Sequence, residues 1–214
     1  MKYRLLDLGL IEYEDAYILQ QGLVNCCNGR YGYNTLLLLE HPPIFTIGRT
    51  GSSKNILCDT NFLKEKNVKV SYVDRGGDIT FHGEGQLVTY PIFNLHEYKC
   101  DLHKYLRALE SVVIDLLGIY NIKGERLEGY TGVWVGASKI ASIGVGVRNW
   151  VTYHGLSLNV NVDLDFFSQI NPCGISQVKM TSLKELLGRD IPIAEVKSHI
   201  VGAFERVFNL EVLN

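Results

Sequence analysis

The sequence predicts an α/β protein of the α+β type, in which helices pack on a mixed β-sheet. Two observations favour this class. Most of the chain consists of short apolar segments patterned like strands, whereas only a few longer segments repeat apolar residues at helical spacing. The strands and helices also do not alternate regularly, so repeated strand–helix–strand winding is not favoured. Because the 214 residues contain no Pro/Ser-rich linker, repeat or low-complexity segment, we expect a single domain over residues 1–214.

The first half of the chain is predicted to hold two helices and most of the strands. Apolar residues recur at helical spacing over residues 13–28, and a short helix is expected over 62–66. Pro42 and Pro43 force a turn after a buried strand. Strands are expected at 1–9, 35–39, 44–47, 68–73, 79–82 and 87–93. The last two of these segments flank Gly83-Glu84-Gly85, which predicts a hairpin.

The second half contains the clearest helical pattern. Leucines and valines form a 3.6-residue stripe over residues 101–120, which predicts an amphipathic helix. Three strands follow at 132–135, 140–147 and 151–162, and two helices at 183–187 and 194–208 close the chain.

Composition and motifs exclude several classes of function. A formal net charge of -2 provides no basic footprint for nucleic acid, and the longest apolar run, residues 36–39, is far too short for a membrane span. The N-terminus lacks the pattern of a signal peptide, so we expect a cytoplasmic protein. The five cysteines are odd in number and lack C-x-x-C spacing, which argues against a disulfide framework and a zinc site. Since phosphate-loop motifs are also missing, we expect neither a metal nor another cofactor.

A glycine-rich stretch, residues 75–91, interrupts the strand pattern. It reads RGGDITFHGEGQLVTYP and contains four glycines. Glycine inside a strand usually means that another group approaches the backbone closely, so we interpret this stretch as the rim of a substrate pocket. Arg75 could hold an anion or carbonyl there, although a plain arginine in a turn is an equal alternative.

Cys173 is the candidate nucleophile. It lies between Pro172 and Gly174, in a turn that can present a thiol, and a buried inert cysteine is the alternative. A thiolate needs a nearby cation or base, for which Lys139, His82 and His154 are candidates. Lys139 starts an apolar strand with few other charges, but local sequence favours an exposed, solvated lysine at the start of a strand. Both histidines precede glycine at the expected end of a strand, where either a functional or a structural role is open.

Taken together, four ordered motifs resemble the lipoyl(octanoyl) transferases of lipoate biosynthesis. They are Arg75-Gly-Gly-Asp-Ile-Thr-Phe-His-Gly-Glu-Gly-Gln86, Lys139-Ile-Ala-Ser-Ile-Gly-Val-Gly-Val-Arg148, Tyr153-His-Gly-Leu-Ser-Leu-Asn-Val160 and Asn171-Pro-Cys-Gly-Ile175. An earlier segment, Leu39-Glu-His-Pro-Pro-Ile-Phe-Thr-Ile-Gly-Arg49, looks like the N-terminal signature of that family. The resemblance covers about residues 35–183. One departure is Glu84, where the family usually has proline.

The resemblance implies a fold related to the catalytic domain of biotin and lipoate protein ligases, and a Cys/Lys dyad. By motif match, Cys173 would carry the acyl group and Lys139 would lower its pKa. The acyl-substrate site would be lined by Arg75, Gly76, Gly77, Asp78, Ile79, Thr80, Phe81 and His82, by Ser142, Ile143 and Gly144, and by Gly155, Leu156 and Ser157.

The resemblance also implies the partners of the reaction. The donor would be octanoyl-acyl carrier protein, and the acceptors would be lipoyl domains of 2-oxoacid dehydrogenase complexes and the glycine cleavage H protein. A thioester donor is already activated, so Cys173 could take the acyl group without ATP. Three alternatives stay open: an ATP-dependent lipoate-protein ligase of the same fold, a cysteine-dependent thioester hydrolase, and a non-catalytic carrier-binding module.

Overall fold

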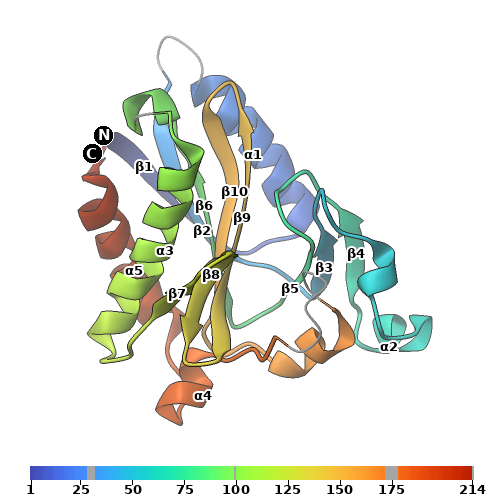
Figure 1. Ribbon diagram of the computed structural model, residues 1–214. Coiled ribbons are helices and arrows are strands. Elements are labelled where there is room, and N and C mark those ends of the chain that lie inside the picture. The colour runs from blue at the N-terminus through green and yellow to red at the C-terminus, as the bar shows by residue number, and fades with distance from the viewer. Residues whose placement is uncertain (28–31, 99, 172–177, 214) are drawn as a thin grey trace.

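The computed structural model describes residues 1–27, 32–98, 100–171 and 178–213, in which two β-sheets are joined side by side and flanked by helices (Figure 1). The larger sheet has eight strands in the order β11-β1-β2-β6-β10-β9-β8-β7, and the smaller has three in the order β4-β3-β5.

The strands are β1 Lys2–Leu10, β2 Asn34–Glu40, β3 Ile44–Ile47, β4 Lys69–Tyr72, β5 Ile79–His82, β6 Gln86–Ile92, β7 Glu125–Leu127, β8 Tyr130–Val135, β9 Ser138–Arg148, β10 Val151–Asn159 and β11 Glu211–Val212. The helices are α1 Tyr13–Cys27, α2 Thr60–Glu65, α3 Leu102–Ile119, α4 Leu183–Leu187 and α5 Ile193–Phe208, with 3₁₀ turns η1 Ser53–Asn55, η2 Leu95–Tyr98 and η3 Leu164–Gln169.

Both sheets are mixed, which confirms the predicted fold class. In the larger sheet β1 runs parallel to β2 and β11, whereas β2, β6, β10, β9, β8 and β7 pair antiparallel in succession. In the smaller sheet β3 is parallel to β4 and antiparallel to β5.

The centre of the larger sheet is covered on both faces. Successive leucines of β2 alternate between two cores: Leu36 and Leu38 belong to one, and Leu37 and Leu39 to the other. Helices α3 and α5 cover the first face and α1 covers the second (Figure 1). The period of two along a strand therefore explains why the run of four leucines is buried throughout.

The amphipathic stripe of α3 is the best-predicted element. Its apolar face packs against β8, β9, β10 and α5 and is buried from Leu109 to Leu117, whereas Leu102 at its start is exposed. The helix begins where the Asp101 carboxylate accepts a hydrogen bond of 3.0 Å from the Lys104 N–H. This cap satisfies a backbone donor that the first turn would otherwise leave open.

The smaller sheet has a core of its own, built from aromatic rings. Phe81 of β5 lies opposite Phe45 of β3 and stacks on Phe166 of η3, with ring centroids 5.7 and 4.5 Å apart, respectively. Because these rings are buried between β3, β5 and η3, the smaller sheet stands as a separate layer beside the larger one (Figure 1).

The predicted hairpin around Gly83-Glu84-Gly85 is wrong. Strand β5 pairs with β3 in the smaller sheet, whereas β6 lies between β2 and β10 in the larger one. The chain leaves one sheet for the other here, and the Glu40 carboxylate accepts a hydrogen bond of 2.8 Å from the Gly85 N–H. Nearness in sequence favours hairpin pairing. The side chain of Phe81, however, packs in the core of the smaller sheet, whereas β6 packs in the cores of the larger sheet.

Other boundaries moved by a few residues. The strand expected at 151–162 ends at Asn159, and His154 lies inside β10 rather than at its end. Strands β7 and β11 were not predicted, because their side chains are exposed and show no apolar alternation. None of the described helices combines the length and the apolar character that crossing a membrane requires.

Candidate active site

Two adjoining cavities open beside the junction of the sheets. The larger has a volume of about 480 Å³, which lies in the range of ligand pockets, and the smaller has a volume of about 30 Å³. Thr80, Ser142 and Gly144 line both of them, so the cavities share a wall. Strand β9 therefore links the two.

The larger cavity is mostly apolar. Its walls come from α3, β8, β9, η3 and the glycine-rich loop before β5, and one charged side chain, Lys139, lies among the residues that line it. The lining residues are Gly76, Gly77, Ile79, Thr80, Leu102, Leu106, Gly129, Tyr130, Thr131, Trp134, Lys139, Ser142, Ile143, Gly144, Val145, Phe167, Val178 and Met180. An aliphatic chain would find here an apolar surface with an ammonium group on its wall.

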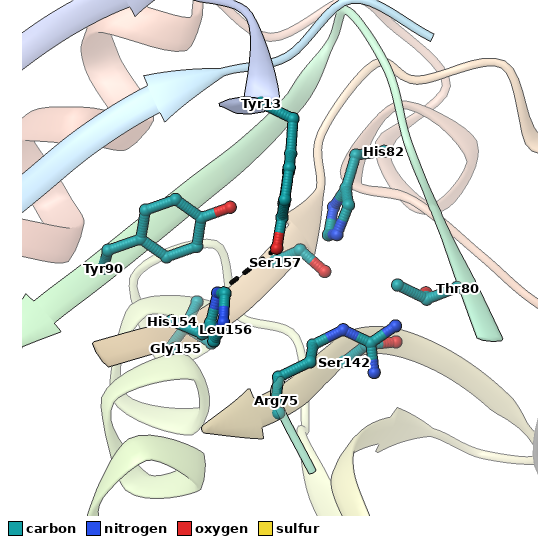
Figure 2. Close-up of a pocket in the computed structure, with 11 residues that line it drawn as sticks. Tyr13, Arg75, Thr80, His82, Tyr90, Ser142, His154, Gly155, Leu156 and Ser157 are labelled. Carbon is teal, nitrogen blue, oxygen red and sulfur yellow. Dashed lines mark hydrogen bonds between the residues drawn. The ribbon is translucent and has the colours of Figure 1, made fainter. Parts of the chain in front are cut away.

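Several polar side chains line the smaller cavity. In Figure 2 the side chains of Tyr90, Tyr13 and His82 enter from the left, the top and the upper right, and the Arg75 guanidinium lies near Thr80 and Ser142. His154, Gly155, Leu156 and Ser157 of β10 complete the lining together with Gly144.

The loop at Arg75 ties the cavities to the smaller sheet. The Arg75 guanidinium is almost fully buried and donates hydrogen bonds to the carbonyl and hydroxyl oxygens of Thr46, at 2.7 and 2.9 Å. The Gly76 N–H donates to the Val145 carbonyl of β9. A β-carbon at Gly144 would lie only 2.8 Å from the Gly76 carbonyl oxygen, so the close approach of β9 to this loop requires glycine.

A chain of buried amides fixes the tautomer of His82. The Thr181 carbonyl accepts a hydrogen bond from Asn159 Nδ2 at 3.0 Å, which leaves Asn159 Oδ1 to accept one from Gln86 Nε2 at 3.0 Å. Gln86 Oε1 then faces His82 Nδ1 at 2.7 Å, and since an amide oxygen only accepts, Nδ1 must carry the proton. His82 Nε2 is therefore left as an acceptor.

Two further histidines are fixed in the same way. His41 Nδ1 lies 2.7 Å from the Ile11 carbonyl and so carries the proton, which leaves Nε2 to accept from the Tyr90 hydroxyl at 2.8 Å. His154 donates from Nε2 to the Asp74 carboxylate at 2.9 Å, and its Nδ1 faces the Tyr13 hydroxyl at 3.4 Å (Figure 2). The hydroxyl protons of both tyrosines are thereby directed to histidine nitrogens.

Burial keeps these histidines neutral. It lowers the pKa of His41 to about 4 and also lowers the pKa values of His82 and His154. The hydrogen bond from His154 holds the pKa of the Asp74 carboxyl far below its usual range, helped by a hydrogen bond from Tyr153. The smaller cavity is thus lined by the neutral imidazoles of His82 and His154 and by the permanently charged Arg75.

Acidification is expected to destabilise the protein through these histidines. An unfolded histidine has a pKa of about 6.5, so below this pH the unfolded chain binds more protons than the folded one. The free energy of unfolding should fall by up to about 1.4 kcal/mol per pH unit for each histidine, and the contribution of His41 should level off near pH 4. Asp74, whose pKa is also lowered, adds a loss below about pH 4.

Urea unfolding between pH 7 and about pH 5 measures this effect. The His41→Phe variant should show a shallower pH dependence than the native chain. Equal slopes for native chain and His41→Phe would contradict the prediction.

The structure brings most of the predicted substrate residues together. Arg75, His82, Gly155, Leu156 and Ser157 line the smaller cavity, Gly76, Gly77, Ile79, Ile143 and Lys139 line the larger, and Thr80, Ser142 and Gly144 line both. Asp78 instead accepts hydrogen bonds from the Asn55 side chain, and Phe81 lies in the core of the smaller sheet. Cys173 lies outside the described residues.

Several lining residues were not found from sequence. Tyr13 was counted in the apolar stripe of α1, Tyr90 in a strand and Trp134 in another, because burial in a core and exposure to a cavity give the same pattern. The one sequence signal near these residues was His41, which lies in the His-Pro-Pro segment and contacts the Tyr90 hydroxyl. Among the described residues, no three His, Cys, Asp or Glu side chains gather so that they could hold a metal ion.

Comparison with known proteins places the chain in context. Residues 12–205 match the family described as Lipoyl protein ligase A/B catalytic domain. The chain is 45% identical over 199 residues to an octanoyltransferase of Pelobacter propionicus, covering 93% of this chain and 92% of that protein. It is 47% identical over 203 residues to an octanoyltransferase of Caldicellulosiruptor bescii, covering 94% and 89%.

Solved structures share the fold at low identity. A lipoate-protein ligase A bound with ATP superposes with a TM-score of 0.77 at 17% identity, covering 100% of this chain and 90% of that one. A biotin protein ligase from Aquifex aeolicus gives a TM-score of 0.53 at 18% identity, covering 98% and 69%. These likenesses confirm the predicted fold, which the chain shares with both ligases.

Proposed function

Since this chain belongs to the lipoyl protein ligase A/B catalytic-domain family, in which octanoyltransferases are its close relatives, we propose that it transfers an octanoyl group through a Cys173 acyl-enzyme. The donor is a thioester on an acyl carrier protein, and the acceptor is the ε-amine of a lysine on a lipoyl domain. The observation that carries this proposal is the apolar cavity of about 480 Å³ with Lys139 in its wall.

The first half-reaction loads the protein. The Cys173 thiol gives its proton to Lys139, and the resulting thiolate attacks the carbonyl carbon of the donor thioester. A C–S bond to Cys173 forms as the C–S bond to the pantetheine arm breaks, and the Lys139 ammonium donates its proton to the departing thiolate. One thioester replaces another, so this step is nearly isoenergetic and uses no ATP.

The second half-reaction transfers the acyl group from Cys173 to the acceptor. The lysine amine of the acceptor attacks the acyl carbon, neutral Lys139 takes the proton from the attacking nitrogen, and the Cys173 thiolate leaves. The amide that forms is more stable than the thioester that breaks, which drives the transfer forward. Lys139 ends as an ammonium beside the thiolate, which is the ion pair that attacks the next donor thioester.

The proposed partners are those that the family resemblance implies. Acceptors are the lipoyl domains of 2-oxoacid dehydrogenase complexes and the glycine cleavage H protein, and the whole chain acts as one domain in the cytoplasm. An ATP-dependent ligase is the second candidate, favoured by the fold shared with a ligase that binds ATP. A ligase would need no cysteine nucleophile.

Intact-protein mass spectrometry separates these two functions. The purified chain is mixed with octanoyl-acyl carrier protein in the absence of ATP, and an apo-lipoyl domain is then added. We expect the octanoyl mass first on this chain and then on the lipoyl domain. If octanoate reaches the lipoyl domain only when free octanoate and ATP are supplied, the ligase replaces the transferase.

The glycine loop allows a test of the cavity assignment. Gly77 has a φ of +86°, so Gly77→Val would combine backbone strain with blockage. A β-carbon at Gly76 would meet only the Val145 carbonyl at 3.5 Å, an ordinary contact, so Gly76→Val is the cleaner variant. We expect Gly76→Val to load octanoate at least about tenfold more slowly, since a side chain would occupy the acyl site.

Gly22 on α1 provides the matched control, because a β-carbon there would meet nothing within 4 Å. Gly22→Val should load at the native rate. Native loading by Gly76→Val, with normal thermal unfolding, would remove the larger cavity from the acyl site.

A further inference from the structure

A β-bulge directs Lys139 toward Trp134. On the hairpin of β8 and β9, Val133 pairs with Ala141, but the next residue, Trp134, pairs with Lys139. One step along β8 thus corresponds to two along β9, and Ile140 is the extra residue. Without this bulge Trp134 would lie opposite Ile140, and Lys139 would project to the other face of the sheet.

The side chain of Lys139 then crosses β8 over a glycine. A β-carbon at Gly132 would lie 2.5 Å from Lys139 Cε and 3.2 Å from its Nζ, so the aliphatic stem occupies the space that a larger residue would fill. Gly132 and Trp134 are two residues apart and share one face of the strand. The ammonium continues across that face to the indole, where Nζ lies 4.9 Å from the ring centroid.

Both strands are held in place on either side of this contact. The Gly132 N–H donates to Glu110, a fully buried carboxylate that also accepts from Arg107 and Arg126 at 2.8 and 2.9 Å. On β9, the Lys139 N–H donates to the Lys179 carbonyl at 2.8 Å, and the Lys139 carbonyl accepts from the Thr181 N–H at 2.9 Å. The backbones beneath the lysine and the tryptophan are therefore fixed independently.

We propose that Trp134 is a positioning residue for acyl transfer, whose indole face holds the Lys139 ammonium in its charged form beside the larger cavity. A cation within about 6 Å of a tryptophan centroid is attracted to the negative face of the ring, and the attraction is stronger where water is excluded. Trp134 is 6% exposed and lines the larger cavity together with Lys139.

This assignment rests on the proposed function, because it acts through Lys139. An ammonium stabilised by the indole favours the thiolate of Cys173 during loading. When Lys139 has lost its proton in the acyl-enzyme, the same ring face makes it a better acceptor for the proton of the incoming amine. Trp134 thus contributes to both half-reactions without touching the proton that moves.

Fluorinated tryptophan tests the electrostatic part of the contact at nearly constant shape. The chain has two tryptophans, so Trp150→Phe provides a background in which Trp134 is the only position labelled. Proteins containing mono-, di- and tetrafluorotryptophan are compared for the rate of octanoyl loading. Fluorine withdraws charge from the ring face, so we expect the rate to fall stepwise, by about 2- to 30-fold at tetrafluorotryptophan.

Two comparisons make the result decisive. In a Lys139→Met background the fluorine series should be flat, because the cation is gone. Trp134→Phe, which keeps an aromatic face, should retain more activity than Trp134→Leu. A flat series in the chain that keeps Lys139, or a loss of rate that follows thermal stability instead of fluorine number, would overturn the assignment of Trp134.

The same data separate this inference from the proposed function. If Lys139→Met loads octanoate as fast as the native chain, the Cys/Lys dyad fails and Trp134 has nothing to position. If Lys139→Met is slow and the fluorine series is flat, the dyad stands and the inference about Trp134 alone is wrong.

Discussion

Replacing Cys173 by serine is expected to abolish the octanoyl adduct and to reduce transfer to a lipoyl domain by at least about 10³-fold. A serine hydroxyl is not ionised by a neighbouring ammonium at neutral pH, and without the thiolate no acyl-enzyme forms. The measurement is intact-protein mass spectrometry of the loading reaction, followed by quantification of octanoylated lipoyl domain.

Two other cysteines serve as controls. Cys26 is exposed and Cys100 is partly exposed, so both are accessible to an acyl donor. Cys26→Ser and Cys100→Ser should load as the native chain does. An adduct that persists in Cys173→Ser and disappears in Cys100→Ser would move the nucleophile to the other thiol.

Replacing Lys139 by methionine is expected to slow the two half-reactions by different amounts. A free thiol with a pKa of about 8.5 is only about 3% thiolate at pH 7, so loading should fall by about 30-fold and recover toward pH 9. Discharge additionally loses the group that takes the proton of the amine, which costs about 10²- to 10⁴-fold. Rapid-quench measurement of each half-reaction across this pH range checks both statements.

Lys179 supplies the matched control, because its side chain is exposed and its backbone carbonyl accepts the hydrogen bond from the Lys139 N–H. Lys179→Met should keep both native rates. A Lys139→Met variant whose loading stays slow at pH 9 would show that Lys139 does more than ionise the thiol, and one that discharges normally would assign the second proton transfer to another group.

Local patterns were sufficient where the burial of an element follows the geometry of its own backbone. The stripe of α3 and the leucines of β2 were predictable because burial against a helix or sheet repeats with the period of the backbone itself. The pairing of β5 was not predictable, because its partner β3 lies more than thirty residues earlier and the nearer β6 gives an equally good hairpin signal.

The candidate site shows the same division. Lys139 and the glycines around Arg75 could be selected by motif, since their chemistry and backbone freedom are visible in one stretch of chain. The contact between Lys139 and Trp134 could not, because a bulge of one residue decides whether Lys139 or Ile140 lies opposite Trp134, and no local signal marks the bulge. Likewise, the amide chain behind His82 joins β5, β6, β10 and the segment before α4.

That amide chain has an entropic consequence. An asparagine amide, a glutamine amide and an imidazole that each had two orientations or tautomers would share eight arrangements, worth about 1.2 kcal/mol at 25 °C if all were equally populated. The Thr181 carbonyl can only accept, and each link passes that constraint to the next, so His82 has one arrangement before any ligand arrives. A substrate entering the small cavity therefore meets an acceptor whose orientation it does not have to select.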